Sequence, residues 1–177
     1  MAQRLFASLT TQEALCVAIS IEMRNARLYR QYADLFGSFP NSDSQEIAAV
    51  FKEMAEEESG HETELRTRYG YRFGDAFCDV SADDVAELVE LPRVPDGSIF
   101  AIARAGAATV PASQALGIAF AAEQGAFRFY RRLAESCNDP ELAEFYAELT
   151  RFEAEHLEEV RFRLEAARAI ASGPQQA

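Results

Sequence analysis

The sequence contains two Glu-x-x-His motifs, and these constrain the fold more than any other feature. The motifs run from Glu58 to His61 and from Glu153 to His156, and the second follows the first by 95 positions. Residues three apart on an α-helix lie on the same face, so each motif directs one carboxylate and one imidazole to one point. The chain has only two histidines, and each ends one of the motifs. We therefore expect two long helices that face each other.

Apolar residues recur at intervals of three and four over four long segments, which predicts an all-α chain of four amphipathic helices. The predicted helices cover about residues 11–36, 43–69, 112–137 and 140–170. Thr10 with Glu13 forms a capping box before the first helix, and Ser42 with Gln45 offers one before the second. The second helix is expected to end near Gly70.

Carboxylates interrupt the apolar stripes of all four predicted helices. Glu22 and Glu123 are the charged members of the first and third stripes, while Glu58 and Glu153, each with its histidine, occupy apolar positions of the second and fourth. The remaining acids of the second helix mostly fall off its stripe, and we expect them to be solvated. They are Glu53, Glu56, Glu57, Glu62 and Glu64.

The two halves of the chain resemble each other in sequence. The first and third helices align with an offset of 101, which pairs Glu22 with Glu123 and Tyr29 with Tyr130. The second and fourth align with an offset of 95, which pairs the two motifs. This indicates a single domain, residues 1–177, built as a four-helix bundle of two pseudo-symmetric hairpins. A site on the symmetry axis would receive the same ligands from both halves.

Residues 71–111 form the predicted crossover between the hairpins, because glycine and proline interrupt any long helix there. Ser81 with Asp84 could cap a short helix that continues to about residue 91, and Asp96 a second that continues to about residue 105. The crossover is therefore expected to be structured, and it is long enough to pass along the bundle.

Composition excludes several classes of function. The chain is 49% hydrophobic and 26% charged, which is typical of one globular domain, and its formal net charge is −12. The negative charge argues against nucleic acid as a partner. No apolar run is long enough to span a membrane, and the first ten residues do not resemble a signal peptide, so we expect a cytoplasmic protein without a membrane partner.

The three cysteines, Cys16, Cys78 and Cys137, are far apart and form no Cys-x-x-Cys motif. This argues against a disulfide framework, a zinc ribbon and a rubredoxin-type iron site. Each cysteine is expected to be a small buried apolar residue in a reducing compartment.

Four carboxylates in an apolar interior would raise one another's pKa values, because desolvation and like charges both disfavour ionisation. A pair of divalent cations would neutralise them. Four carboxylates and two imidazoles suit two first-row metal ions, and the absence of thiolate favours iron or manganese over a structural zinc. The candidate metal ligands are Glu22, Glu58, His61, Glu123, Glu153 and His156.

Three polar residues on the same helices have two interpretations each. Tyr29 and Tyr130 follow Glu22 and Glu123 by seven residues, where a hydroxyl could bond a ligand carboxylate or supply an electron. They could equally be ordinary core tyrosines. Asn25 could support the ligands or lie exposed at the edge of the stripe.

In their order along the chain, the four glutamates and two histidines resemble the ligand motifs of the ferritin-like superfamily of di-iron carboxylate proteins. Within that superfamily they resemble the rubrerythrin group most closely. The resemblance covers the four long helices. It implies that Glu58 and Glu153 bridge two iron ions, that Glu22 and Glu123 are terminal ligands and that His61 and His156 bind one ion each. The chain departs from a typical rubrerythrin at Ala126, where the group has a further glutamate, and in lacking a four-cysteine rubredoxin-like module.

The resemblance implies an oxidoreductase with a role in oxidative stress. Two iron ions, with manganese or zinc as possible occupants, would react with hydrogen peroxide or dioxygen, and an external electron donor would restore Fe(II). The alternatives are an iron-binding protein for storage or delivery, and a helical interaction domain with a vestigial site. We expect a homodimer, whereas a storage protein would require a larger cage.

Overall fold

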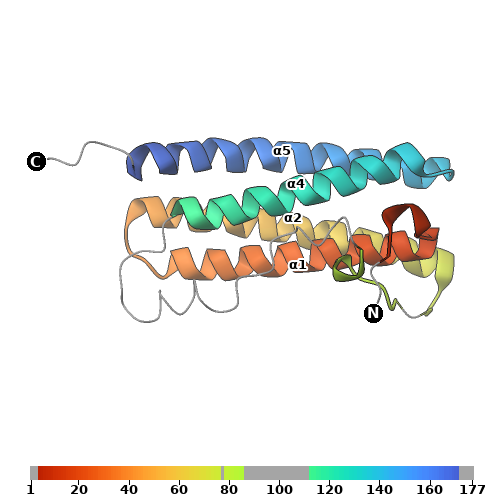
Figure 1. The fold of residues 1–177 in the computed structure, drawn as a ribbon. Coiled ribbons are helices and arrows are strands. Elements are labelled where there is room, and N and C mark those ends of the chain that lie inside the picture. Colours follow the sequence, from red (N-terminus) through yellow and green to blue (C-terminus); the bar gives the residue numbers. More distant parts are fainter. Residues whose placement is uncertain (1–3, 77, 86–111, 172–177) are drawn as a thin grey trace, which may run out of the picture.

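The computed structural model describes residues 4–76, 78–85 and 112–171. Four long helices run lengthwise side by side (Figure 1). They are α1 (Thr11–Gly37), α2 (Ser42–Phe73), α4 (Ala112–Ser136) and α5 (Pro140–Ala171). α1 packs against α2 and α4 against α5, so the chain forms two hairpins. The prediction of a ferritin-like four-helix bundle is confirmed.

The connections agree with a crossover between the hairpins. The turn between α1 and α2 lies at one end of the bundle, and the turn between α4 and α5 lies at the other (Figure 1). α4 therefore begins at the opposite end of the bundle from the end of α2, as a long crossover requires. The short helix predicted from 96 to 105 lies outside the described residues, as does the part after residue 85 of the one predicted to follow Ser81 and continue to about residue 91.

Local side-chain chemistry explains where the helices begin and end. Thr10 and Glu13 form the predicted capping box before α1. The prediction for α2 was wrong by one residue, because Asn41 accepts the hydrogen bond from the Ser44 backbone N–H and is the N-cap. α2 also continues past Gly70 to Phe73, and its C-cap is Gly74, whose φ of 61° is a conformation that glycine adopts without strain.

The apolar core forms two clusters, one at each end of the bundle. The first cluster includes Leu15, Leu65 and Leu142, and the second includes Phe51 and Val160. Along every long helix, the buried glutamate comes after the residues of one cluster and before those of the other. The polar residues of the interior therefore form a layer between two apolar regions.

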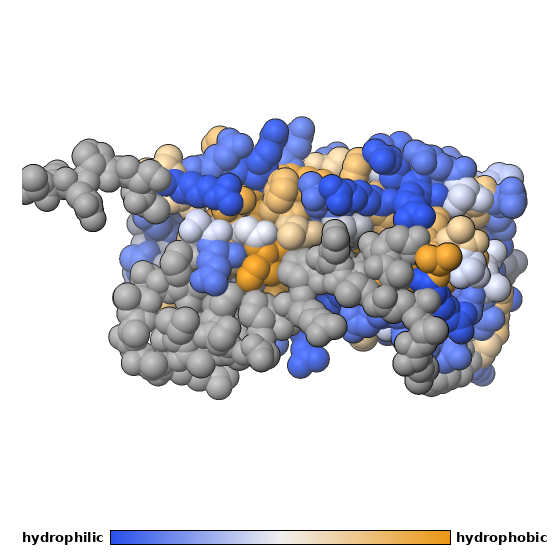
Figure 2. Space-filling model, viewed as in Figure 1, coloured by the Kyte–Doolittle hydropathy of each residue, from blue (hydrophilic) through white to orange (hydrophobic). Residues whose placement is uncertain are grey.

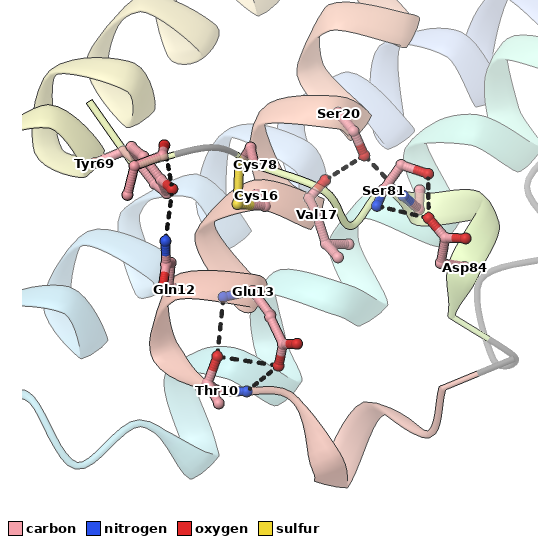
Figure 3. The surroundings of a disulfide bond; sticks show 12 residues. Thr10, Gln12, Glu13, Cys16, Val17, Ser20, Tyr69, Cys78, Ser81 and Asp84 are labelled. Atoms are coloured by element: carbon pink, nitrogen blue, oxygen red, sulfur yellow. Dashed lines mark hydrogen bonds between the residues drawn. A yellow bond between two sulfur atoms is a disulfide. The ribbon is translucent and has the colours of Figure 1, made fainter. Parts of the chain in front are cut away.

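Cys16 on α1 forms a disulfide bond with Cys78, which follows α2, and the expectation that the cysteines are reduced was wrong for this pair (Figure 3). Their Cα atoms are 5.6 Å apart although 62 positions separate them in sequence. Sequence distance misled the prediction because the segment after α2 folds back onto α1. Cys137 is a free, half-buried thiol.

Hydrogen bonds hold this returning segment against α1 (Figure 3). The Ala82 backbone N–H donates to the Ser20 hydroxyl oxygen at 2.8 Å. The predicted capping box of Ser81 and Asp84 is present, and it precedes a single 3-10 turn, η2 (Ala82–Asp84). A second short turn, η1 (Phe6–Ser8), precedes α1. The start of the crossover is thus structured, as expected.

Hydrophilic side chains cover much of the described surface seen in Figure 2, with hydrophobic ones scattered between them. The large exposed apolar residues among those described are Leu5, Met23, Tyr71, Phe152 and Phe162. Within the described ranges, no helix is both long enough and apolar enough to cross a membrane.

Candidate metal centre

All six predicted ligands lie in the polar layer between the two core clusters. The four glutamates are fully buried, and the side chains of His61 and His156 are 12% and 10% exposed. Each helix contributes one glutamate, and α2 and α5 each add the histidine one turn later. The layer forms because the buried glutamates of the four helices lie at the same position along the length of the bundle.

The candidate ligands form two groups of four residues, and the groups share two residues. One group is Glu22, Glu58, His61 and Glu153, and the other is Glu58, Glu123, Glu153 and His156. Within each group one oxygen or nitrogen atom per residue lies within 4.8 Å of the others. Such a spacing suits four donors arranged around one ion, and the shared residues Glu58 and Glu153 lie between the two positions.

Both histidines turn Nδ1 toward the carboxylates. Nδ1 of His61 is 3.4 Å from Oε2 of Glu22. Nδ1 of His156 is 3.3 Å from Oε1 of Glu58 and 3.4 Å from Oε2 of Glu123. The two rings are 6.5 Å apart between centroids. Each group therefore has one imidazole nitrogen of its own.

Many polar atoms of this layer have no hydrogen-bond partner among the described residues. They are both oxygens of Glu58 and of Glu153, Oε2 of Glu22 and of Glu123, and Nδ1 of each histidine. Leaving a buried polar group unpaired costs about 1–3 kcal/mol, and more for a charged group, so a fold rarely gathers several. All of these atoms are metal donors, and the set therefore fits a bound cation pair.

The remaining oxygens of the outer glutamates are held by tyrosines from the opposite hairpin. The Tyr29 hydroxyl on α1 donates to Oε1 of Glu123 on α4, and the Tyr130 hydroxyl on α4 donates to Oε1 of Glu22 on α1. Both tyrosines are fully buried. The hydroxyls therefore contact the carboxylates of candidate ligands, which was one of the two interpretations of these residues.

Burial, followed by the charges of Glu22 and Glu123, raises the pKa of Glu58 well above its usual value. Burial, with the charges of Glu58 and Glu123, does the same to the pKa of Glu153. A divalent cation would reverse this balance, because it stabilises the ionised carboxylates.

The pKa values of two other groups in the layer shift in favour of the charged forms of those groups. Burial acts to lower the pKa of His156, but Glu123, Glu153 and Glu57 outweigh it and raise that pKa to about 10. Burial acts to raise the pKa of Glu123, yet interaction with His156 and Glu153 brings it below its usual value. Without a metal, His156 therefore supplies positive charge that partly neutralises the layer.

The pKa values of Tyr29 and Tyr130 are raised well above the usual value, first by burial and then by nearby carboxylates. Both phenols consequently remain protonated near neutral pH. A protonated phenol is a hydrogen-bond donor, and this agrees with their contacts to Glu123 and Glu22.

Sequence reasoning missed two residues that contact the histidines. Glu57, expected to be solvated, lies with its Oε2 atom 2.7 Å from Nε2 of His156, although its side chain is 49% exposed. Phe152 packs against His61 with 5.0 Å between ring centroids. Asn25 is buried, which excludes the exposed interpretation, and its amide has no partner among the described residues.

Residues 13–95 match the Rubrerythrin family. The match spans α1 and α2 and includes three of the six candidate ligands, Glu22, Glu58 and His61. The predicted rubrerythrin resemblance is thus confirmed over this part of the chain. Ala126 of α4, at the position of the further glutamate in typical rubrerythrins, is fully buried.

The chain is also similar in fold to a solved structure, that of an uncharacterized conserved protein from Magnetospirillum magnetotacticum MS-1. The two chains are 22% identical, the TM-score is 0.68, and the similarity covers 96% of this chain and 99% of the other. This similarity supports the fold alone. No curated protein matches the chain.

Proposed function

We propose that the chain binds two iron ions in the buried layer and is an oxidoreductase that reacts Fe(II) with hydrogen peroxide or dioxygen. The observation that supports this most directly is the pair of overlapping four-residue groups, in which every residue has at least one side-chain atom without a hydrogen-bond partner among the described residues. Four carboxylates and two neutral imidazoles carry four negative charges, which two divalent ions would balance. Iron bound here would supply one electron from each ion to the oxidant.

The pattern of paired and unpaired oxygens supports a role for each glutamate. Glu22 and Glu123 each have one oxygen bonded to a tyrosine and one unpaired, which suits a terminal ligand that uses one oxygen. Glu58 and Glu153 have both oxygens unpaired and belong to both groups, which suits a bridging ligand. These are the roles that the rubrerythrin resemblance implies.

The surrounding residues would hold the ligands and control protons. Tyr29 and Tyr130 orient the outer carboxylates, and their hydroxyl protons lie next to the ligand oxygens. The two core clusters exclude bulk water from both ends of the layer, which strengthens electrostatic interactions within it. An external electron donor would return the site to its reduced form.

The test begins with anaerobic titration of the metal-free protein with Fe(II), which should bind two equivalents per chain. Mixing the loaded protein with peroxide or with dioxygen in a stopped-flow instrument should give rapid oxidation and a ferric absorbance band. Glu153→Gln should abolish the rapid phase, whereas Glu148→Gln, an exposed residue on the same helix, should not. Absence of reaction with both oxidants would refute the proposal.

The same experiment distinguishes an iron-handling protein from an enzyme. Repeated turnover with an added reductant, while iron stays bound, would support catalysis. A single oxidation followed by release of Fe(III) would favour storage or delivery. The mass of the assembly in solution provides a second criterion, since the expected homodimer is too small to enclose a mineral core.

A further inference from the structure

The two halves of the metal layer differ at one pair of positions that the duplication relates. Glu57 precedes Glu58 and Phe152 precedes Glu153, so they share the offset of 95 that relates the two motifs. Each side chain reaches across to the histidine of the other hairpin. One histidine thus meets a carboxylate where the other meets an aromatic ring.

Glu57 fixes the orientation of His156. Nδ1 of this histidine faces Glu58 and Glu123, so when Nδ1 binds a cation the ring proton lies on Nε2. Nε2 is 2.7 Å from Oε2 of Glu57, which accepts that proton in a hydrogen bond. A carboxylate on the far nitrogen of a metal-binding histidine fixes the tautomer and makes the other nitrogen a stronger donor.

His61 lacks this support. Its Nδ1 atom faces Glu22, but no carboxylate among the described residues bonds its Nε2 atom. The Phe152 ring packs against the imidazole at an interplanar angle of 46° and accepts no comparable hydrogen bond. His61 is therefore oriented by packing, while His156 is oriented by packing and by a charged acceptor.

We propose that the two metal positions are inequivalent. The position that contains His156 binds its ion first and more tightly, and the position that contains His61 is the exchangeable one, with Glu57 as the positioning residue that sets the difference. The inference rests on the proposed metal binding but not on the oxidation chemistry. Loss of such a carboxylate typically weakens metal binding 10- to 100-fold.

The experiment is calorimetric titration of the full metal-free chain with Co(II), with visible absorption followed in parallel. The wild-type protein should bind two ions in steps whose dissociation constants differ at least tenfold. Glu57→Gln should weaken the first step about 10- to 100-fold and shift the Co(II) absorption bands of the first equivalent. Glu56→Gln, a neighbouring substitution at a 71% exposed side chain, should change neither.

A substitution at Phe152 tests the other half in the opposite direction. Phe152→Glu supplies the missing hydrogen-bond acceptor to His61. It should lower the dissociation constant of the second step toward that of the first. The double exchange, Glu57→Phe with Phe152→Glu, should reverse the order of loading. His61→Ala and His156→Ala assign the steps, because each removes one position and leaves the other.

The outcomes separate this inference from the proposed function. Two ions that bind with equal affinity, or a Glu57→Gln variant with unchanged steps, would overturn the inequivalence and leave the metal site intact. Failure of the wild-type protein to bind any divalent ion would overturn the proposed function as well. Circular dichroism of each metal-free variant shows whether it is folded, and both substituted side chains are partly exposed.

Discussion

The hydroxyl of Tyr29 on α1 donates a hydrogen bond to Glu123 on α4, so a residue of the first hairpin orients a candidate ligand of the second. The equivalent contact from Tyr130 to Glu22 runs in the opposite direction. The two hairpins are therefore joined through the polar layer itself. Changes at either tyrosine should affect metal binding and the association of the hairpins together.

Tyr29→Phe removes the one hydroxyl that bonds Oε1 of Glu123 in the part of the chain that the structure describes. We expect the metal affinity to fall about tenfold, and the metal-free protein to lose about 1.5–3 kcal/mol of stability, as is usual for a hydrogen bond to a charged group. Calorimetric titration and chemical unfolding measure the two effects.

Tyr146→Phe is the matched control for this prediction. Tyr146 is also buried, but its hydroxyl oxygen has no hydrogen-bond partner in the described residues. Its removal should leave the metal affinity unchanged and should not lower the stability, because no hydrogen bond is lost. Equal losses in the two variants would show that Tyr29 acts through packing alone.

The helices and the polar layer were predictable because their signals are local. A glutamate on an otherwise apolar stripe must point inward whatever the helix packs against, so Glu22 and Glu123 could be placed without a structure. The duplication then indicated which helices pair. Caps were less certain, since Asn41 and Ser42 are both good N-cap residues and only the backbone geometry decides between them.

The contacts that the sequence did not reveal depend on tertiary structure. Glu57 lies at the edge of the α2 stripe and resembles the solvated acids around it until His156 of α5 is placed beside it. The Cys16–Cys78 bond depends on the path of the segment that follows α2. Neither contact has a periodic pattern, although comparing Glu57 with Phe152 at the offset of 95 could have marked that position as unusual.

Glu58→Gln should have opposite effects on the two forms of the protein. Without metal, a fully buried carboxylate beside like charges destabilises the fold, so the neutral amide should raise stability by on the order of 1 kcal/mol. With metal, the variant loses a shared ligand and should gain little or no stability from added Co(II). Thermal unfolding with and without the ion measures both effects, and a destabilised metal-free variant would contradict the prediction.

The stability of the metal-free protein should fall as pH rises from about neutral to alkaline. His156 has a pKa raised from 6.5 to about 10, so the folded state holds a proton that the unfolded state has lost. This contribution is complete below pH 6.5 and disappears as the pH approaches 10. The raised pKa values of Glu58 and Glu153 also make stability fall with rising pH, beginning at a pH near the usual pKa of a glutamate.

Metal loading should flatten this dependence, because the cations replace the protons. Unfolding midpoints of the metal-free and loaded proteins, measured between about pH 6 and pH 10, test the prediction. The lowered pKa of Glu123 acts in the opposite direction, but only at acidic pH, where its contribution is lost as the pH falls. A metal-free midpoint that increases with pH in the alkaline range would be incompatible with the proposed charge balance.

Loss of the Cys16–Cys78 bond should reduce stability without changing the metal site. Because 62 positions separate the two cysteines, the chain-entropy model gives a cost of about 4 kcal/mol. The double variant Cys16→Ala with Cys78→Ala, or treatment with a reductant, tests this by chemical unfolding. Cys137→Ala removes the free thiol and serves as the control. An equal loss in the control would show that cavity formation, rather than the cross-link, is responsible.

The repeated hairpin also has an evolutionary consequence. A single hairpin with one glutamate on its first helix and one Glu-x-x-His on its second offers only half of the donors, so a half-length ancestor would have built the centre at the contact between two identical copies. Identical copies cannot differ at equivalent positions. When the two copies are encoded separately, as in this fused chain, their equivalent positions can differ, and Glu57 and Phe152 give each ion its own surroundings.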